Sequence, residues 1–171
     1  SLKENSVLSI EAAEGFSFLY LLWDKPVGAY SLKAGDETLS CGENGFLHEY
    51  ISLPSPQTSA EITLPAGGIL CEVYLFSAGK TPPWVQIWQP PLTKADLLLL
   101  PTHADDEHLF FGGAMPYYAG ELGLDVQVCY FNNHWAEPYR SHELLDGLWT
   151  VGIKAYPVIS PSADRYFNNL K

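Results

Sequence analysis

The feature that most constrains the fold is a change of pattern at Gln89-Pro90-Pro91. Before these prolines, short runs of β-branched and aromatic residues recur at close spacing; after them, strand-length and helix-length segments alternate. Proline donates no backbone hydrogen bond and stiffens the chain, which suits a connector between domains. The sequence therefore predicts two domains, one over residues 1–92 and one over residues 95–171.

The first domain is predicted to be all β, as a sandwich or a small barrel. Its expected strands lie within Phe16 to Trp23, Ala60 to Leu64, Glu72 to Phe76 and Trp84 to Trp88. Clusters of Gly, Pro, Asn and Ser separate these runs and favour turns. We take the sandwich as the fold of this domain.

The second domain is predicted to alternate strands and helices. The continuous apolar run over residues 96–101 is typical of a strand buried on both faces of a parallel sheet. Helical sequence should follow to about residue 122, with a break near Gly112-Gly113 and Pro116 in the first turn after it. A strand over 125–131, a helix over 138–151 and a strand over 154–159 complete an α/β, Rossmann-like pattern, doubly wound by right-handed crossovers.

Composition narrows the class of protein. With 47% hydrophobic and 17% charged residues, the chain can form a packed core. Its net charge of −11 argues against nucleic acid and anionic membrane surfaces as partners, and no apolar run is long enough to span a bilayer. Three cysteines do not make a disulfide framework, although a single bridge between Cys41 and Cys71 stays open.

The candidate chemistry follows the first strand of the second domain, in His103-Ala104-Asp105-Asp106-Glu107. Ligands of open α/β sheets bind beyond the carboxyl ends of the strands, where this loop must lie. His103 and Asp106, three residues apart, can turn one nitrogen and one oxygen toward a single Zn²⁺ and leave positions open for water. Asp105 can then face the water and act as general base.

A structural alternative exists for each of these groups. Acidic residues at strand ends often cap the next helix, where they accept its free N–H groups. Arg140 and Glu143, at a spacing of three, can form a surface ion pair. His134 follows the second strand and can line the cleft or lie exposed in a loop.

The string from Leu97 to Glu107, followed by Gly112-Gly113, resembles the opening signature of the PIG-L, or LmbE-like, de-N-acetylase family. That signature is a hydrophobic strand, then His-Pro-Asp-Asp-Glu and a Gly-Gly pair; Ala104 stands here at the proline position. Residues 125–131, 140–143 and 148–153 resemble the family's next strand, its Arg-x-x-Glu helix start and its leucine-glycine segment. The resemblance covers about residues 95–160.

The resemblance implies zinc-dependent removal of an N-acetyl group from glucosamine-type sugars or conjugates. His103 and Asp106 would bind zinc, Asp105 would be the catalytic base, and Arg140, Glu143 and His134 would bind or orient substrate. The family's third zinc ligand is a histidine late in the domain, and no histidine of this sequence matches that position. We therefore expect an incomplete zinc site and a chain that is the front part of a longer enzyme.

The alternative function is a non-catalytic glycan-binding protein. In that case the β-sandwich would carry the binding, with exposed tryptophans such as Trp84, Trp88 or Trp23 stacking on sugar rings, although aromatic residues of sandwiches more often lie in the core. The appended β domain, the acidic charge and a start without a leader suggest a secreted or cell-surface protein.

Overall fold

The computed structural model describes residues 6–65, 67–79 and 81–163 of the chain. Contacts between residues divide it into two compact units, Ser1–Trp88 and Gln89–Lys171. Each unit is described separately below. No helix within the described residues is long and apolar enough to cross a membrane.

The first unit is built on a sheet of five antiparallel strands in the order β3-β2-β4-β1-β5. The strands are β1 (Val7–Trp23), β2 (Tyr30–Ala34), β3 (Glu37–Cys41), β4 (His48–Thr63) and β5 (Leu70–Phe76). The prediction of a β-rich first unit is therefore confirmed.

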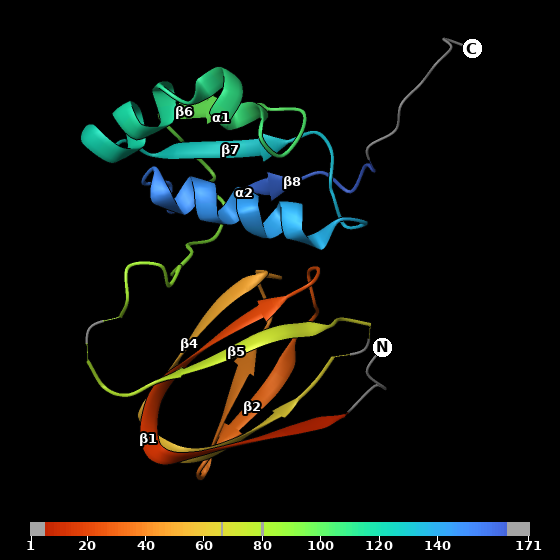
Figure 1. Ribbon diagram of the computed structural model, residues 1–171, viewed down its shortest axis with the longest axis vertical. Coiled ribbons are helices and arrows are strands. Elements are labelled where there is room, and N and C mark those ends of the chain that lie inside the picture. Colours follow the sequence, from red (N-terminus) through yellow and green to blue (C-terminus); the bar gives the residue numbers. More distant parts are fainter. Residues whose placement is uncertain (1–5, 66, 80, 164–171) are drawn as a thin grey trace. The chain divides into compact units, whose positions relative to one another are not determined.

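Two long strands let this single sheet fold over itself. The register of β1 against β4 shifts between Glu11 and Phe16 and again before Phe18, and β1 curves strongly there (Figure 1). Strand β2 pairs with the end of β4, whereas β5 pairs with the second half of β1. Strands β1 and β4 thus contribute to both halves, and their hydrogen bonds make one bent sheet.

One face of the β4-β1-β5 half forms the core and the other is covered by the segment over 81–88. The first carries Leu19, Leu21 and Trp23, all fully buried. The second carries Tyr20, whose ring contacts that of Trp84. The predicted strand from Trp84 to Trp88 is wrong, because this segment pairs with no strand and covers the sheet instead.

The covering segment is fixed by a buried polar network. Gln86 Oε1 lies 2.7 Å from Nδ1 of His48 and accepts the indole N–H of Trp88 at 2.8 Å. The Tyr20 hydroxyl lies 3.1 Å from the same His48 nitrogen. These residues are buried, so their polar atoms must be bonded inside the unit.

The three cysteines are free, so the Cys41–Cys71 bridge left open by the sequence does not form. Cys41 is buried beside Glu49 and Cys71 is exposed. The cysteines therefore contribute no cross-link to the fold.

The second unit holds a parallel sheet of three strands in the order β6-β7-β8. Its elements are β6 (Leu97–Leu99), α1 (Asp106–Phe111), η1 (Pro116–Glu121), β7 (Val126–Tyr130), α2 (Pro138–Thr150) and β8 (Val158–Ile159). The element types and order match the predicted ones, and the helical break falls near Gly112-Gly113 as expected. The broader Rossmann-like assignment stays a prediction.

Both helical connections lie on one face of this sheet. The strand order advances in one direction, and right-handed crossovers then place both helices on the same face. Helices α1 and α2 also approach closely, since a Cβ added at Gly147 would lie 2.6 Å from the His108 ring. A doubly wound arrangement is not seen in residues 89–163.

The opposite face of the parallel sheet is open along its β6 edge. Leu98 and Leu100 are about half exposed, whereas Leu99, on the helix-covered face, is buried. The expectation that the Leu97–Leu100 run is buried on both faces is therefore wrong. The physical reason is that side chains alternate along a strand and helices cover only one face here.

Gln89, expected in the connector, and Leu92, expected at the end of the first domain, are both bonded within the second unit. The Gln89 N–H donates to Lys154 O at 3.0 Å, and Gln89 O accepts the N–H of Tyr156 at 2.8 Å. Leu92 N–H donates to Oε1 of Gln127 on β7. This segment accordingly covers part of the otherwise open sheet face at Gln127.

Candidate functional site

The site residues gather in the loop between β6 and α1. Strand β6 ends at Leu99, and α1 begins at Asp106, so the loop lies at the carboxyl edge of the sheet. The neighbouring chain after β7 runs alongside, because Phe131 N–H bonds to Pro101 O and Asn132 N–H bonds to Thr102 O. This pairing brings His134 and α2 to the same edge.

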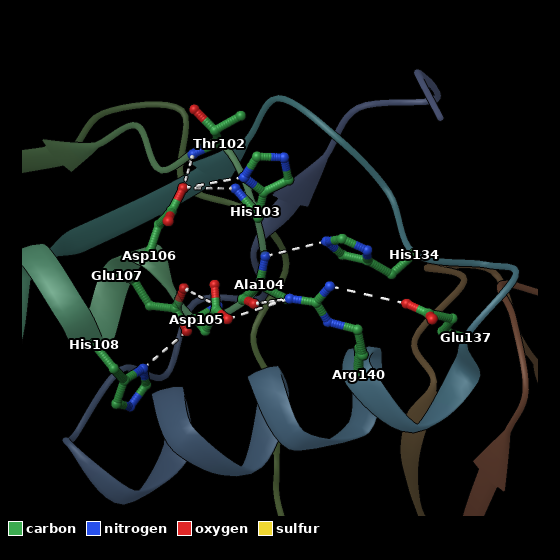
Figure 2. A network of polar contacts seen from close by, with 10 residues as sticks. All are labelled: Thr102, His103, Ala104, Asp105, Asp106, Glu107, His108, His134, Glu137 and Arg140. Carbon is green, nitrogen blue, oxygen red and sulfur yellow. Dashed lines mark hydrogen bonds and ion pairs between the residues drawn. The ribbon is translucent and has the colours of Figure 1, made fainter. Parts of the chain in front are cut away.

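His103 and Asp106 converge as the sequence predicted. Their Nδ1 and Oδ2 atoms lie 3.4 Å apart, and both side chains are partly exposed. The same Oδ2 accepts the backbone N–H groups of Thr102 at 3.2 Å and His103 at 3.0 Å (Figure 2). Asp106 therefore closes the loop and sets His103 beside its own carboxylate.

Asp105 occupies the N-cap position of α1 but does not cap it. Its side chain makes no capping hydrogen bond, which argues against a helix-capping role for Asp105 itself. The Asp105 side chain is 60% exposed and lies 3.3 Å from the guanidinium of Arg140. It thus stays accessible to a molecule bound at the sheet edge.

Arg140, on α2, joins the two sides of the site. Its Nη2 atom donates to Ala104 O at 2.7 Å and to Asp105 Oδ2 at 3.3 Å. Its Nη1 atom lies 3.8 Å from Glu137 (Figure 2). The ion-pair partners of Arg140 among the described residues are Asp105 and Glu137, so the alternative pairing with Glu143 is not formed.

His134 is buried rather than exposed in a loop. Its Nε2 atom accepts the backbone N–H of Ala104 at 3.2 Å, and its ring centre lies 6.1 Å from that of His103. In this arrangement Nε2 is engaged with the backbone. The structure therefore places His134 behind the site loop, supporting Ala104.

Glu143 lines a hollow of about 290 Å³ between α1 and α2. Asp105, Arg140 and His108 border the same hollow, together with the apolar Leu144. Carboxylate, guanidinium and imidazole groups at one rim can bind hydroxyl or amide groups of a ligand. The hollow is thus a candidate substrate site next to the predicted base.

Glu107 is a site residue to which sequence reasoning gave no role. Its side chain is 1% exposed, and it accepts the backbone N–H of Asp105 at 3.0 Å and lies 2.8 Å from His108 Nδ1. Tyr130 of β7 lies close by, and its pKa is raised first by burial and then by the Glu107 carboxylate. In the sequence, the only indication of a role for Glu107 was its position directly after Asp105 and Asp106.

Residues 6–65, 67–79 and 81–163 contain no group of three histidine, cysteine, aspartate or glutamate side chains arranged to hold a metal ion. His103 and Asp106 supply two donors, one nitrogen and one oxygen. Catalytic zinc sites take three protein ligands and keep one position open. The described residues therefore fit a zinc ion in part, with two of the ligands in place.

Comparisons with known protein families, with curated proteins and with solved structures found no match to this chain.

Proposed function

We propose that the second unit is a Rossmann-like domain of the PIG-L type that acts in zinc-dependent hydrolysis of an N-acetyl group. The observation that carries the proposal is the meeting of His103 and Asp106 at 3.4 Å at the carboxyl edge of a parallel sheet. An accessible Asp105 lies between them in sequence. A nitrogen donor, an oxygen donor and an accessible carboxylate are three of the parts of a hydrolytic zinc site, and a third protein ligand would complete it.

His103 and Asp106 would hold the zinc, and a third donor would complete the site. Bound zinc would bring the pKa of a water molecule to about 7 and polarise the amide carbonyl. Asp105 would take the proton of the attacking water and return it to the leaving amine. Arg140 supports this role because it holds Asp105 Oδ2 at 3.3 Å.

The proposed substrates are N-acetylated amino sugars or their conjugates. The hollow beside Asp105 supports this class, because Arg140, Glu143 and His108 offer charged and hydrogen-bonding groups at its rim. A sugar carries hydroxyl groups that such a rim can bind. We place the protein outside the cell or at its surface, where glycoconjugates are abundant, and propose no nucleic-acid partner.

Zinc content and acetate release test the proposal together. Zinc would be measured by elemental analysis, and acetate would be measured with N-acetylglucosamine derivatives, for this chain and for a longer protein that contains it. His103→Ala should lower zinc content and abolish acetate release, whereas His142→Ala, a matched histidine change on α2, should alter neither. A longer protein that binds no zinc and releases no acetate would refute the proposal.

A second candidate function is glycan binding by the first unit. The observation in its favour is Trp84, which is 49% exposed and whose ring packs against those of Tyr74 and Phe76. Trp23 and Trp88 are buried, so they belong to the packed interior and offer no platform. Glycan-array binding that is lost in Trp84→Ala and retained in Asp105→Asn would favour this function; a blank array would remove it.

A further inference from the structure

The peptide that joins Ala104 to Asp105 is held from both sides. Its carbonyl oxygen accepts a 2.7 Å hydrogen bond from Arg140 of α2. Its N–H donates a 3.0 Å hydrogen bond to Glu107 of α1. The peptide immediately before the candidate base is therefore clamped by two charged side chains from different helices (Figure 2).

The clamp holds an unfavourable backbone conformation. Asp105 has φ 120° and ψ −30°, and it is the one non-glycine residue with positive φ in the part of the chain that the structure describes. Such a conformation crowds the Cβ atom and persists only where surrounding contacts fix it. The contacts that fix it here are those to Arg140 and Glu107.

Glu107 occupies a costly place for a carboxylate. Its side chain is 1% exposed, and burying a charged group is unfavourable unless hydrogen bonds compensate. One oxygen contacts His108 Nδ1 at 2.8 Å and the other accepts the Asp105 N–H at 3.0 Å. Fixing the Asp105 peptide requires a hydrogen-bond acceptor at this point, and the Glu107 carboxylate supplies it.

We propose that Glu107 is the positioning residue for the general base. By accepting the N–H of Asp105, it orients the Ala104–Asp105 peptide so that the Asp105 carboxylate stays beside Arg140 and open to substrate. Glu107 acts through the backbone and does not itself exchange protons with substrate. This inference rests on the proposed function, because it takes Asp105 to be the base.

Three substitutions at one position separate positioning from packing. Glu107→Gln keeps an oxygen that accepts the Asp105 N–H; Glu107→Leu keeps the bulk without an acceptor; Glu107→Asp keeps the charge but is too short to reach. In the zinc-loaded protein, the Leu and Asp variants should have a kcat for acetate release about 100-fold lower, as displacement of a catalytic group does. KM and zinc content should change less than about threefold, and Gln should retain kcat within about fivefold.

Equal losses of kcat in the Gln and Leu variants would overturn the proposal, because the acceptor alone would then not matter. Wild-type kcat in a folded Leu or Asp variant would overturn it as well. The Asp variant keeps the test decisive if the Leu variant fails to fold. A parallel fall in zinc content would also contradict a role that acts through Asp105.

Hydrogen exchange of the Asp105 amide gives a readout that needs neither zinc nor activity. In the 171-residue chain, Glu107→Leu and Glu107→Asp should speed exchange of this amide about tenfold or more, and Glu107→Gln should leave it near the wild-type rate. Unchanged exchange in the Leu variant would overturn the positioning role. If the wild-type protein binds no zinc and releases no acetate, the proposed function fails, and the exchange result still decides whether Glu107 holds Asp105.

Discussion

Two carboxylates, one in each unit, show how the same chemical group is used differently. Glu49 of β4 accepts hydrogen bonds from the Tyr30 hydroxyl and from Gly42 N–H, and so ties strands and a turn of the first sheet together. Glu107 accepts the N–H of Asp105 and holds a residue whose own carboxylate is left exposed. The first carboxylate links elements of a sheet, whereas the second holds an exposed aspartate in an unfavourable backbone conformation.

The two sheets also differ in how their faces are covered. The β4-β1-β5 half of the first sheet has a core on one face and the 81–88 segment on the other. The parallel sheet of the second unit has helices on one face, while Leu98 and Leu100 on the other remain about half exposed. The described half of the first sheet is therefore covered on both faces, whereas the second unit carries the polar site and a sheet face that is open along β6.

The largest expected effect is the loss of acetate release when Asp105 is replaced. Asp105→Asn should lower acetate release about 10²- to 10⁴-fold, because an amide cannot take the proton of water. Asparagine also tolerates positive φ, so the fold should be kept. Zinc content should stay unchanged, which makes it the control. Unchanged acetate release would show that Asp105 is not the base.

The next largest expected effect is a loss of stability. It compares Leu98 with Leu99 and so tests whether one face of the parallel sheet is open at β6. Leu99→Ala should cost about 2–5 kcal/mol of unfolding free energy, because it leaves a cavity in the covered face. Leu98→Ala, at 54% exposure, should cost less than about 1 kcal/mol. Chemical denaturation of the chain measures both. A loss at Leu98 as large as that at Leu99 would mean that this face is covered in solution.

Removal of the structural carboxylate should change stability without changing chemistry. Glu49→Leu leaves the Tyr30 hydroxyl and Gly42 N–H without their acceptor and should cost about 1–3 kcal/mol in thermal or chemical unfolding. Zinc content and kcat of the folded variant should match those of the wild type. A fall in kcat in this folded variant would contradict the assignment of Glu49 to stability alone and of Glu107 to positioning Asp105.

The smallest expected effect is a difference in reactivity between two cysteine thiols. Burial, followed by the nearby Glu49 and Glu43 carboxylates, raises the pKa of Cys41 to about 12. Burial also raises the pKa of Cys129 of β7, but this thiol is only partly buried and has no carboxylate among the causes. A raised pKa keeps a thiol protonated and unreactive at pH 8. In a Cys71→Ser background, iodoacetamide should therefore modify Cys129 at least about tenfold faster than Cys41. Mass spectrometry of peptides measures the rates, and equal rates would contradict the closed packing of the first unit.

Local signals in the sequence predicted much of the second unit. Pro116 marked the start of η1, because proline suits a first helical turn, and the predicted end near residue 122 agrees with the φ of +63° at Gly123. Residues 84–88 were mistaken for a strand because their composition suits one. Whether such a segment pairs or covers a sheet depends on distant partners, here His48 and Tyr20.

For the candidate site, the sequence predicted that His103 and Asp106 would face one another, since three residues across a tight turn restrict where their side chains can lie. It did not predict the burial of His134 or the ion pair between Arg140 and Asp105. Both depend on how α2 and the chain after β7 approach the loop.

By itself, the sequence determined the order and type of the elements in the second unit, the β-rich character of the first and the loop where candidate chemistry gathers. These properties follow from periodicity, from turn residues and from spacing along the chain, which are local. Only the tertiary structure decided that Glu107 is buried against the Asp105 peptide, that Arg140 completes the clamp and that one face of the parallel sheet lies open. The burial of Glu107 and the contacts of Arg140 depend on which helices meet, and Arg140 lies more than thirty positions from Ala104 and Asp105 in sequence.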